Sequence, residues 1–207
     1  MDDRLTLGLY FELSNDEPAT LAARAAELGT YDGVDRVSTW RCLAEGPTEA
    51  EGALPHRTSL TLGEVTPGFT PAPLADGDRI VLHFEQVRPS QGRLSKEPAE
   101  ALWIVCVNPK GDEHAYRDWA DFVHLPAILD AQLPGFRQVT PYRNAKTKGL
   151  PRFLHFWDLG TSTPGQSLQA LRPAMVERFG DGTPEFQNWL APPDGYTVVH
   201  HAPYVRA

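Results

Sequence analysis

The sequence predicts an α+β fold, with antiparallel strands and helices alternating along 207 residues. Segments with apolar residues at every second position, or at every position, indicate strands, and segments with apolar residues three and four apart indicate helices. Stretches rich in proline, glycine and polar residues at 44–78 and 89–99 indicate loops. The second loop divides the chain into residues 1–88, a linker at 89–99, and residues 100–207.

The N-terminal half begins with a period-two strand in which Leu5, Leu7 and Leu9 alternate with Thr6 and Gly8. The expected elements, in order, are a strand at 5–13, a helix at 16–29, and strands at 34–43, 56–65 and 79–88. A loop at 66–77 takes the place where a second helix would stand. We therefore expect one helix and four strands in this half.

The C-terminal half has a complete β-α-β-β-α-β pattern. The expected elements are a strand at 101–108, a helix at 116–132, strands at 136–143 and 152–159, a helix at 167–179, and a strand at 196–205. Pro126 interrupts the first of these helices and is expected to kink it or divide it in two.

This order of elements is the ferredoxin-like layout, in which two helices cover one face of a four-stranded antiparallel sheet. Valine-rich strands at 81–88 and 198–206 both contain a histidine and end in Val-Arg, which indicates a duplication with a degenerate first copy. We expect the two sheets to pack face to face within one chain as a barrel-like sandwich. A cavity is then expected between sheet and helix in each half, and dimerisation is optional.

The charge balance excludes several classes of partner. The chain has 19 basic and 27 acidic residues, a net charge of −8 and no run of Lys or Arg, so nucleic-acid binding is not expected. No apolar run approaches the ~18 residues of a membrane-spanning helix. The acidic start, Met-Asp-Asp-Arg, is unlike a signal peptide. With Cys42 and Cys106 expected as buried thiols, these features predict a cytoplasmic protein.

One segment carries a family resemblance. Residues 119–126 read Trp-Ala-Asp-Phe-Val-His-Leu-Pro, residues 134–136 read Pro-Gly-Phe, and residues 142–143 read Tyr-Arg. This pattern resembles the EthD-like branch of the dimeric α/β barrel superfamily, although Ala120 stands where a tyrosine is common and the Tyr-Arg order is reversed. The superfamily includes polyketide cyclases, muconolactone isomerases, aldoxime dehydratases, cofactor-free monooxygenases and haem peroxidases. The resemblance therefore implies the fold more strongly than the reaction.

Asp121 and His124 form the first candidate catalytic pair. Three residues apart on a helix, they would share a face, and a carboxylate beside an imidazole raises its basicity. His155 is a candidate partner, expected to face the cavity between the sheets together with Trp157, while Tyr142 would polarise a substrate oxygen. The alternative is structural: a helix-terminal His124 and a hydrogen-bonded core His155.

Other residues are candidates for substrate binding. Trp157 and Trp103 could line an apolar pocket for a flat ligand, and Arg143 could polarise an oxygen. Tyr10 shares a strand face with Glu12, and His83 shares one with Glu85, which makes Tyr10 and His83 further candidates.

No motif for a metal or a nucleotide cofactor is present, so no organic cofactor is expected. A metal site built from distant strands, or a haem on His124 or His155, remains open.

The functional hypothesis is a small-molecule enzyme, an acid/base lyase, isomerase or cyclase acting on a cyclic or aromatic carbonyl compound. One alternative is a cofactor-free monooxygenase of phenolic or polyketide substrates. The other is a non-catalytic ligand-binding or structural protein, whose sign would be a cavity filled by the chain's own tryptophans.

Overall fold

A computed structural model describes residues 8–43, 52–70, 79–93, 95, 97–146 and 148–207. The strands are β1 (Gly8–Ser14), β2 (Val34–Cys42), β3 (Ser59–Val65), β4 (Ile80–Gln86), β5 (Gln91–Gly92), β6 (Ala101–Pro109), β7 (Phe136–Asn144), β8 (Phe153–Leu159) and β9 (Tyr196–Arg206). The helices are α1 (Pro18–Leu28), α2 (Glu113–Trp119), the π-helical turn η1 (Ala120–His124), α3 (Leu125–Asp130), α4 (Pro164–Phe179) and α5 (Pro184–Leu190).

The strands form one antiparallel sheet that closes on itself. Their order is β4-β1-β3-β2-β9-β6-β8-β7-β5, and β4 also pairs with β7. The first eight strands of that order therefore form a closed barrel within one chain. The seams lie at β2–β9, where Trp40 is opposite Arg206, and at β4–β7, where Phe84 is opposite Asn144. Both halves order their strands as fourth, first, third, second.

This closure corrects the expectation of two sheets packed face to face. The halves meet edge to edge, through backbone hydrogen bonds between strands, because each half ends in an open edge that the other can pair. The short strand β5, inside the expected linker, adds to the edge of β7.

The barrel interior is filled by side chains from all eight closing strands. An eight-stranded barrel is just wide enough for its own side chains to fill it. The buried members of this cluster are Leu9, Phe11, Leu13, Trp40, Leu60, Leu62, Leu82, Phe84, Leu102, Ile104, Cys106, Tyr142, Leu154, Val199, Ala202 and Tyr204. The inside of the barrel is thus a packed core, and the helices cover the outside.

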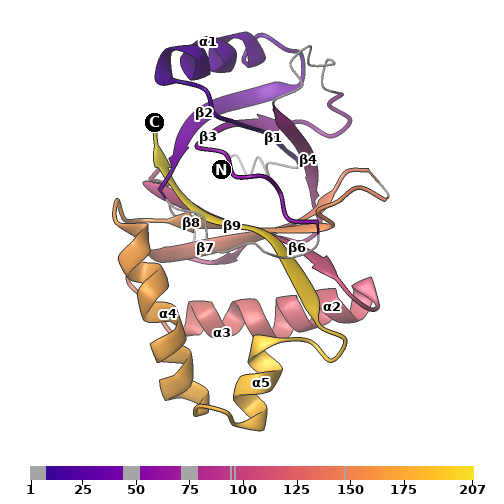
Figure 1. The fold of residues 1–207 in the computed structure, drawn as a ribbon, viewed down its shortest axis with the longest axis vertical. Coiled ribbons are helices and arrows are strands. Elements are labelled where there is room, and N and C mark those ends of the chain that lie inside the picture. The colour runs from indigo at the N-terminus through magenta and orange to yellow at the C-terminus, as the bar shows by residue number, and fades with distance from the viewer. Residues whose placement is uncertain (1–7, 44–51, 71–78, 94, 96, 147) are drawn as a thin grey trace.

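Helices cover the barrel on two opposite sides (Figure 1). α1 packs on β2 and β3 of the N-terminal half, whereas α2, η1, α3, α4 and α5 lie over the sheet of the C-terminal half. The interruption expected at Pro126 takes the form of the π-helical turn directly before it. This turn accommodates a proline ring that would clash with a regular α-helical backbone.

The order of strands and helices agrees with the sequence expectation, with β5 and α5 as additions. The expected strand start at residues 5–7 and the loop at 71–78 lie outside the described residues. Among the described helices, none has the length and apolar character needed to cross a lipid bilayer.

Candidate functional site between the helices and the C-terminal sheet

The side chains of β8 show on which side of the sheet the candidate residues lie. Leu154 belongs to the barrel core, and Phe156 packs against it. Trp157 packs among helix residues, and His155 contacts Tyr116 of α2. The expectation that His155 and Trp157 face a cavity between the sheets is therefore wrong. Both faces of this strand carry large apolar residues, so its alternation could not tell inside from outside.

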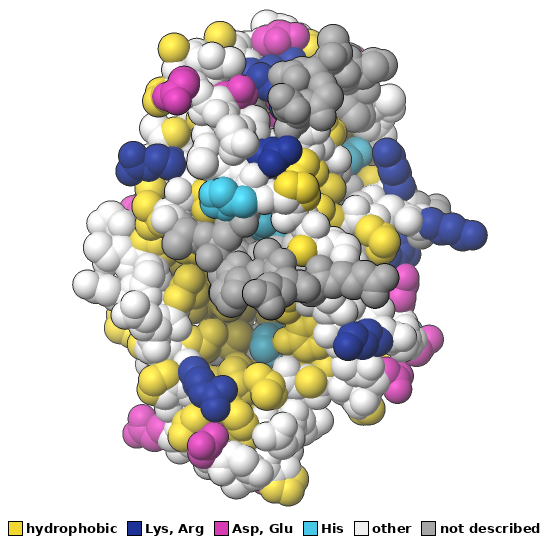
Figure 2. Space-filling model, viewed as in Figure 1, with side chains coloured by type: hydrophobic (Ala, Val, Ile, Leu, Met, Phe, Trp, Pro, Cys, Tyr) yellow, Lys and Arg dark blue, Asp and Glu magenta, His cyan; other side chains and the backbone are white. Residues whose placement is uncertain are grey.

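The surface is hollowed between the C-terminal sheet and its helices. Figure 2 shows this hollow in the lower half of the molecule, lined by hydrophobic side chains, with a histidine at its base. Buried or half-buried histidines on this side of the sheet are His124 of η1, His155 of β8 and His201 of β9. The ring of His201 contacts that of Trp103, with 5.4 Å between ring centroids. An apolar hollow with a few polar groups is typical of a small-molecule site.

His124 lies between two tryptophan rings. Its ring centroid is 4.7 Å from that of Trp119 and 5.4 Å from that of Trp189, and both pairs are stacked. Nδ1 is 3.0 Å from the carbonyl oxygen of Trp189. Because a carbonyl oxygen can only accept, Nδ1 carries the proton and Nε2 carries the lone pair. Burial lowers the pKa of His124 to about 4, and the hydrogen bond to Trp189 opposes this shift.

His155 lies beside His124, with their ring centroids 6.4 Å apart. Its Nε2 is 3.3 Å from the hydroxyl of Tyr116, whose ring is parallel to its own. Burial, and then the proximity of His124 and Arg117, lowers the pKa of His155 well below its usual range. Burial raises the pKa of Tyr116, so its hydroxyl keeps its proton. At neutral pH the site therefore holds two neutral imidazoles and a phenol.

Asp121 does not pair with His124, which corrects the expected acid/base pair. Its Oδ2 is 2.6 Å from Nε of Arg88, and Nη2 of Arg117 donates to both of its carboxylate oxygens. Both Asp121 and His124 lie in η1, where the wider turn of a π-helix no longer brings residues three apart onto one face. Burial raises the pKa of Asp121, and the arginines oppose that shift.

Tyr142 and Arg143 point to opposite sides of the sheet. Tyr142 is buried in the barrel core, against Phe156, so the sheet separates it from His124. Arg143 points outward and lines a different cavity, together with Arg88. Neither residue joins the two histidines.

Trp103 and Trp157 are stacked with ring centroids 5.6 Å apart on the side that the helices cover. Both are buried, at 7% and 1% exposed, and they lie on the same side of the sheet as the hollow. The indole nitrogens of Trp103 and Trp189 are buried and have no hydrogen-bond partner among the described residues. Such donors are available to an acceptor that enters the site.

Tyr10 and His83 lie in the other half of the barrel. They face each other across β1 and β4, and both contact Phe69, on the side covered by α1. Burial lowers the pKa of His83. The structure therefore separates these two candidates from His124 and His155.

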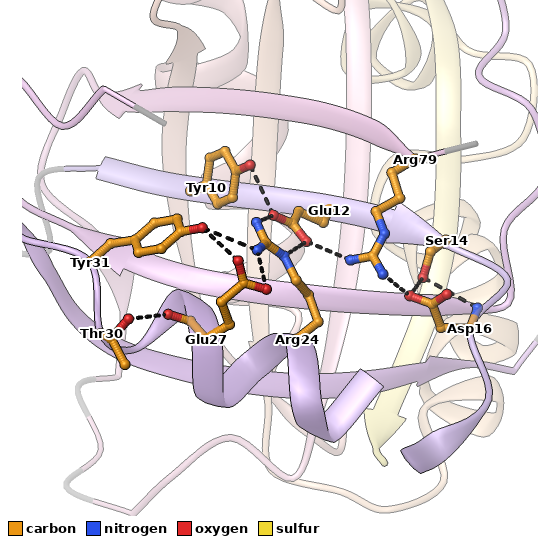
Figure 3. A network of polar contacts seen from close by, with 9 residues as sticks. All are labelled: Tyr10, Glu12, Ser14, Asp16, Arg24, Glu27, Thr30, Tyr31 and Arg79. Carbon is orange, nitrogen blue, oxygen red and sulfur yellow. Dashed lines mark hydrogen bonds and ion pairs between the residues drawn. The ribbon is translucent and has the colours of Figure 1, made fainter. Parts of the chain in front are cut away.

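Tyr10 belongs to a polar network beneath α1 (Figure 3). Its hydroxyl donates to Oε1 of the fully buried Glu12 at 2.9 Å. Arg24 of α1 binds both oxygens of Glu12, at 2.6 and 2.8 Å, and Arg79 binds Oε2 at 3.0 Å. Every acceptor of this carboxylate is engaged, so the network holds α1 to the sheet.

Three residues around the histidines were not identified as site candidates from the sequence. These are Tyr116, Trp119 and Trp189. The spacing of Tyr116 and Trp119 on one helix was a usable signal, since residues three apart on a regular helix share a face. Trp189 gave no comparable signal, because α5 is a short helix after a Gly-Asp-Gly segment.

Within the described ranges, no group of three or more His, Cys, Asp or Glu residues could hold a metal ion.

A scan against protein families finds no match, and no curated protein matches the sequence. Solved structures do match. A major regulator of staphylococcal pathogenesis superposes with a TM-score of 0.52 and 12% identity, covering 96% of this chain and 98% of that one. A proposed monooxygenase from Fusobacterium nucleatum superposes with a TM-score of 0.50 and 8% identity, covering 97% and 93%. At such low identity these likenesses show a shared fold over nearly the whole chain.

Proposed function

We propose that the hollow between the helices and the C-terminal sheet is the active site of a small-molecule enzyme. The observation that carries the proposal is the pair of neutral histidines, His124 and His155, 6.4 Å apart among aromatic rings. Flat aromatic walls suit a flat aromatic substrate. His124 belongs to a π-helical turn, a feature frequently found at functional sites.

His124 is the proposed base. Its Nδ1 proton is bound by the Trp189 carbonyl, and its Nε2 has no hydrogen bond to any described residue. A substrate anion formed next to this ring would raise the pKa of His124, because an opposite charge favours the imidazolium. The phenol of Tyr116, an N–H of His155 and the indole N–H of Trp189, which is unpaired among the described residues, are candidate donors for a developing oxyanion.

Among the reactions that the sequence leaves open, we favour the oxidation by molecular oxygen of a substrate carbon atom whose C–H bond is acidic. The Fusobacterium nucleatum protein with this fold is described as a proposed monooxygenase, and an apolar hollow admits O2. For an anthrone, whose CH2 group is acidified by conjugation with the ring carbonyl, the base removes one proton and the resulting anion gives one electron to O2. The radical and superoxide combine into a peroxide. Loss of the second C–H proton and cleavage of the O–O bond then give C=O and water, with no other reductant.

The non-catalytic alternative also has a specific observation in its favour. Trp119 and Trp189 stack on both sides of His124, and side chains of the chain itself therefore occupy much of the space around that ring. A protein that binds aromatic ligands without converting them would need no more than this.

The test is oxygen uptake by the purified protein with a panel of anthrones, naphthols and cyclic ketones, with products identified by mass spectrometry. Turnover that needs O2 and falls about 10²–10⁴-fold in His124→Ala supports the proposal. The matched control is His114→Ala, since His114 is an exposed histidine on the same helical run. Turnover without O2 would indicate the acid/base lyase, isomerase or cyclase instead. Ligand binding without turnover would indicate the non-catalytic protein.

A further inference from the structure

A second cavity lies on the outside of the barrel, and neither His124 nor His155 lines it. It has a volume of about 340 Å³ and lies between α2 and the adjoining ends of β7 and β8. Arg88, Arg117 and Arg143 line it, together with the ring of Phe153. Three guanidinium groups around one cavity are notable in a chain whose net charge is −8.

The arginines have more hydrogen-bond donors than their neighbours can accept. Asp121 accepts from Arg88 and from Nη2 of Arg117, so one carboxylate serves two guanidinium groups. Nη1 of Arg117 has no hydrogen-bond partner among the residues that the structure describes, although the side chain is only 9% exposed. Arg143 forms no hydrogen bond or ion pair through its side chain within the described part of the chain. Each arginine offers five N–H donors, and most of the donors of these three arginines remain available.

Nearby acids do not remove this excess. Glu113, at the cavity wall, is paired with Arg152 at 2.6 Å. Asp118 is 3.7 Å from both Arg88 and His114. Glu85 is opposite Arg143 in the β4–β7 register, but no ion pair joins them. Glu113 is thus engaged outside the group, Asp118 is near only Arg88 of the three arginines, and Arg143 has no counter-ion among the described residues.

We propose that this cavity binds a small organic oxyanion, a carboxylate attached to an apolar group. The fork of a guanidinium matches the two oxygens of a carboxylate. Arg143 and Arg88, both exposed, would bind the carboxylate, and the apolar part would contact Val87, a half-buried residue of the cavity wall. Phe153, opposite Arg143 across β7 and β8, closes the cavity from below, because its ring is stacked on Tyr116 and is only 2% exposed. Arg117, fixed over Phe153 at 5.3 Å from the ring centroid, supplies a third guanidinium at the wall.

Isothermal titration of the full chain with benzoate, inorganic phosphate and benzamide tests the proposal. Benzoate should bind, and benzamide, which has the same shape without the charge, should not. Tighter binding of phosphate than of benzoate would contradict the organic carboxylate named above. Affinity should fall as salt rises, because the contact is between charged groups.

Arg143→Gln should weaken benzoate binding about tenfold or more, as expected for loss of a bidentate charged contact. The variant should fold normally, since the Arg143 side chain has no hydrogen-bond or ion-pair partner to lose in the described ranges. Arg172→Gln is the matched control, because Arg172 is 69% exposed on α4, where it pairs with Asp181. Equal effects of the two substitutions, an unchanged affinity in Arg143→Gln, or the absence of benzoate binding to the wild type would each overturn the site.

Discussion

Nδ1 of His124 is 3.0 Å from the carbonyl oxygen of Trp189, and this hydrogen bond joins the π-helical turn η1 to the end of α5. It fixes the proton of the imidazole on Nδ1, whichever reaction the site performs. It also directs the unprotonated Nε2 away from that carbonyl. The packing of α5 therefore sets the tautomer and orientation of the His124 imidazole, on which the chemistry proposed for the hollow depends.

The pH dependence of catalysis should follow the low pKa of His124. A base works in its neutral form, and burial lowers the pKa of His124 to about 4. We expect kcat/KM to stay level from neutral pH to near pH 5 and to fall only as the pH approaches 4. A rate that halves near the ordinary histidine pKa of about 6.5 would contradict this assignment. Imidazole NMR of wild type and His124→Gln would assign the titrating ring and its tautomer.

Stability should fall in acid because of the same ring. The folded chain holds His124 neutral down to about pH 4, whereas in the unfolded chain it takes up a proton near pH 6.5. The unfolded state thus binds more protons between these values, so the free energy of unfolding decreases as the pH falls through this window. The full loss from His124 is roughly 3 kcal/mol.

Urea unfolding at pH 7 and pH 4.5 would measure this loss in wild type and in His124→Gln. The glutamine variant should lose less stability between the two pH values, although His155 and His201, whose pKa values burial also lowers, keep part of the dependence. An identical loss in both proteins would show that His124 is not held neutral by the fold.

The succession of strands and helices could be predicted because periodicity is a local property of the sequence. Leu9, Phe11 and Leu13 alternate with Tyr10 and Glu12, and the structure indeed divides them between the core and the helix side. The closure of the barrel could not be predicted in this way. It depends on pairs such as Trp40 with Arg206, which are far apart in sequence and whose edge hydrogen bonds come from the backbone.

The candidate site was predicted in part. His124 and His155 were both singled out, and the structure brings them together. The partner assigned to His124 was wrong, because the expectation used the spacing of a regular helix where the chain forms a π-helical turn. The face assigned to His155 was wrong, because Phe153, Phe156 and Leu154 make both sides of β8 apolar.

Substitution of Asp121 should affect stability rather than proton transfer. Asp121→Asn removes the charge that faces Arg117, whose side chain is buried, and should lower the free energy of unfolding by about 2–3 kcal/mol. The pH profile of any turnover should stay unchanged, since Asp121 has no contact with His124. Asp118→Asn, at a residue that is 48% exposed on the same helical run, is the control and should be nearly neutral. A shifted pH profile in Asp121→Asn would restore the acid/base pair.

Glu12 should be the most sensitive charged residue of the N-terminal half. Its side chain is fully buried and accepts hydrogen bonds from Tyr10, Arg24 and Arg79. Glu12→Ala leaves two guanidinium groups without their shared counter-ion and should lower the free energy of unfolding by about 3–5 kcal/mol. Glu12→Gln keeps the shape of the side chain but removes its charge, and it replaces Glu12→Ala in the test if the alanine variant does not fold. Glu27→Ala is the control, because Glu27 binds Arg24 from the exposed side of α1 and should matter little. Chemical denaturation measures all three variants, and a Glu12→Ala protein as stable as the wild type would show that the network does not hold α1 to the sheet.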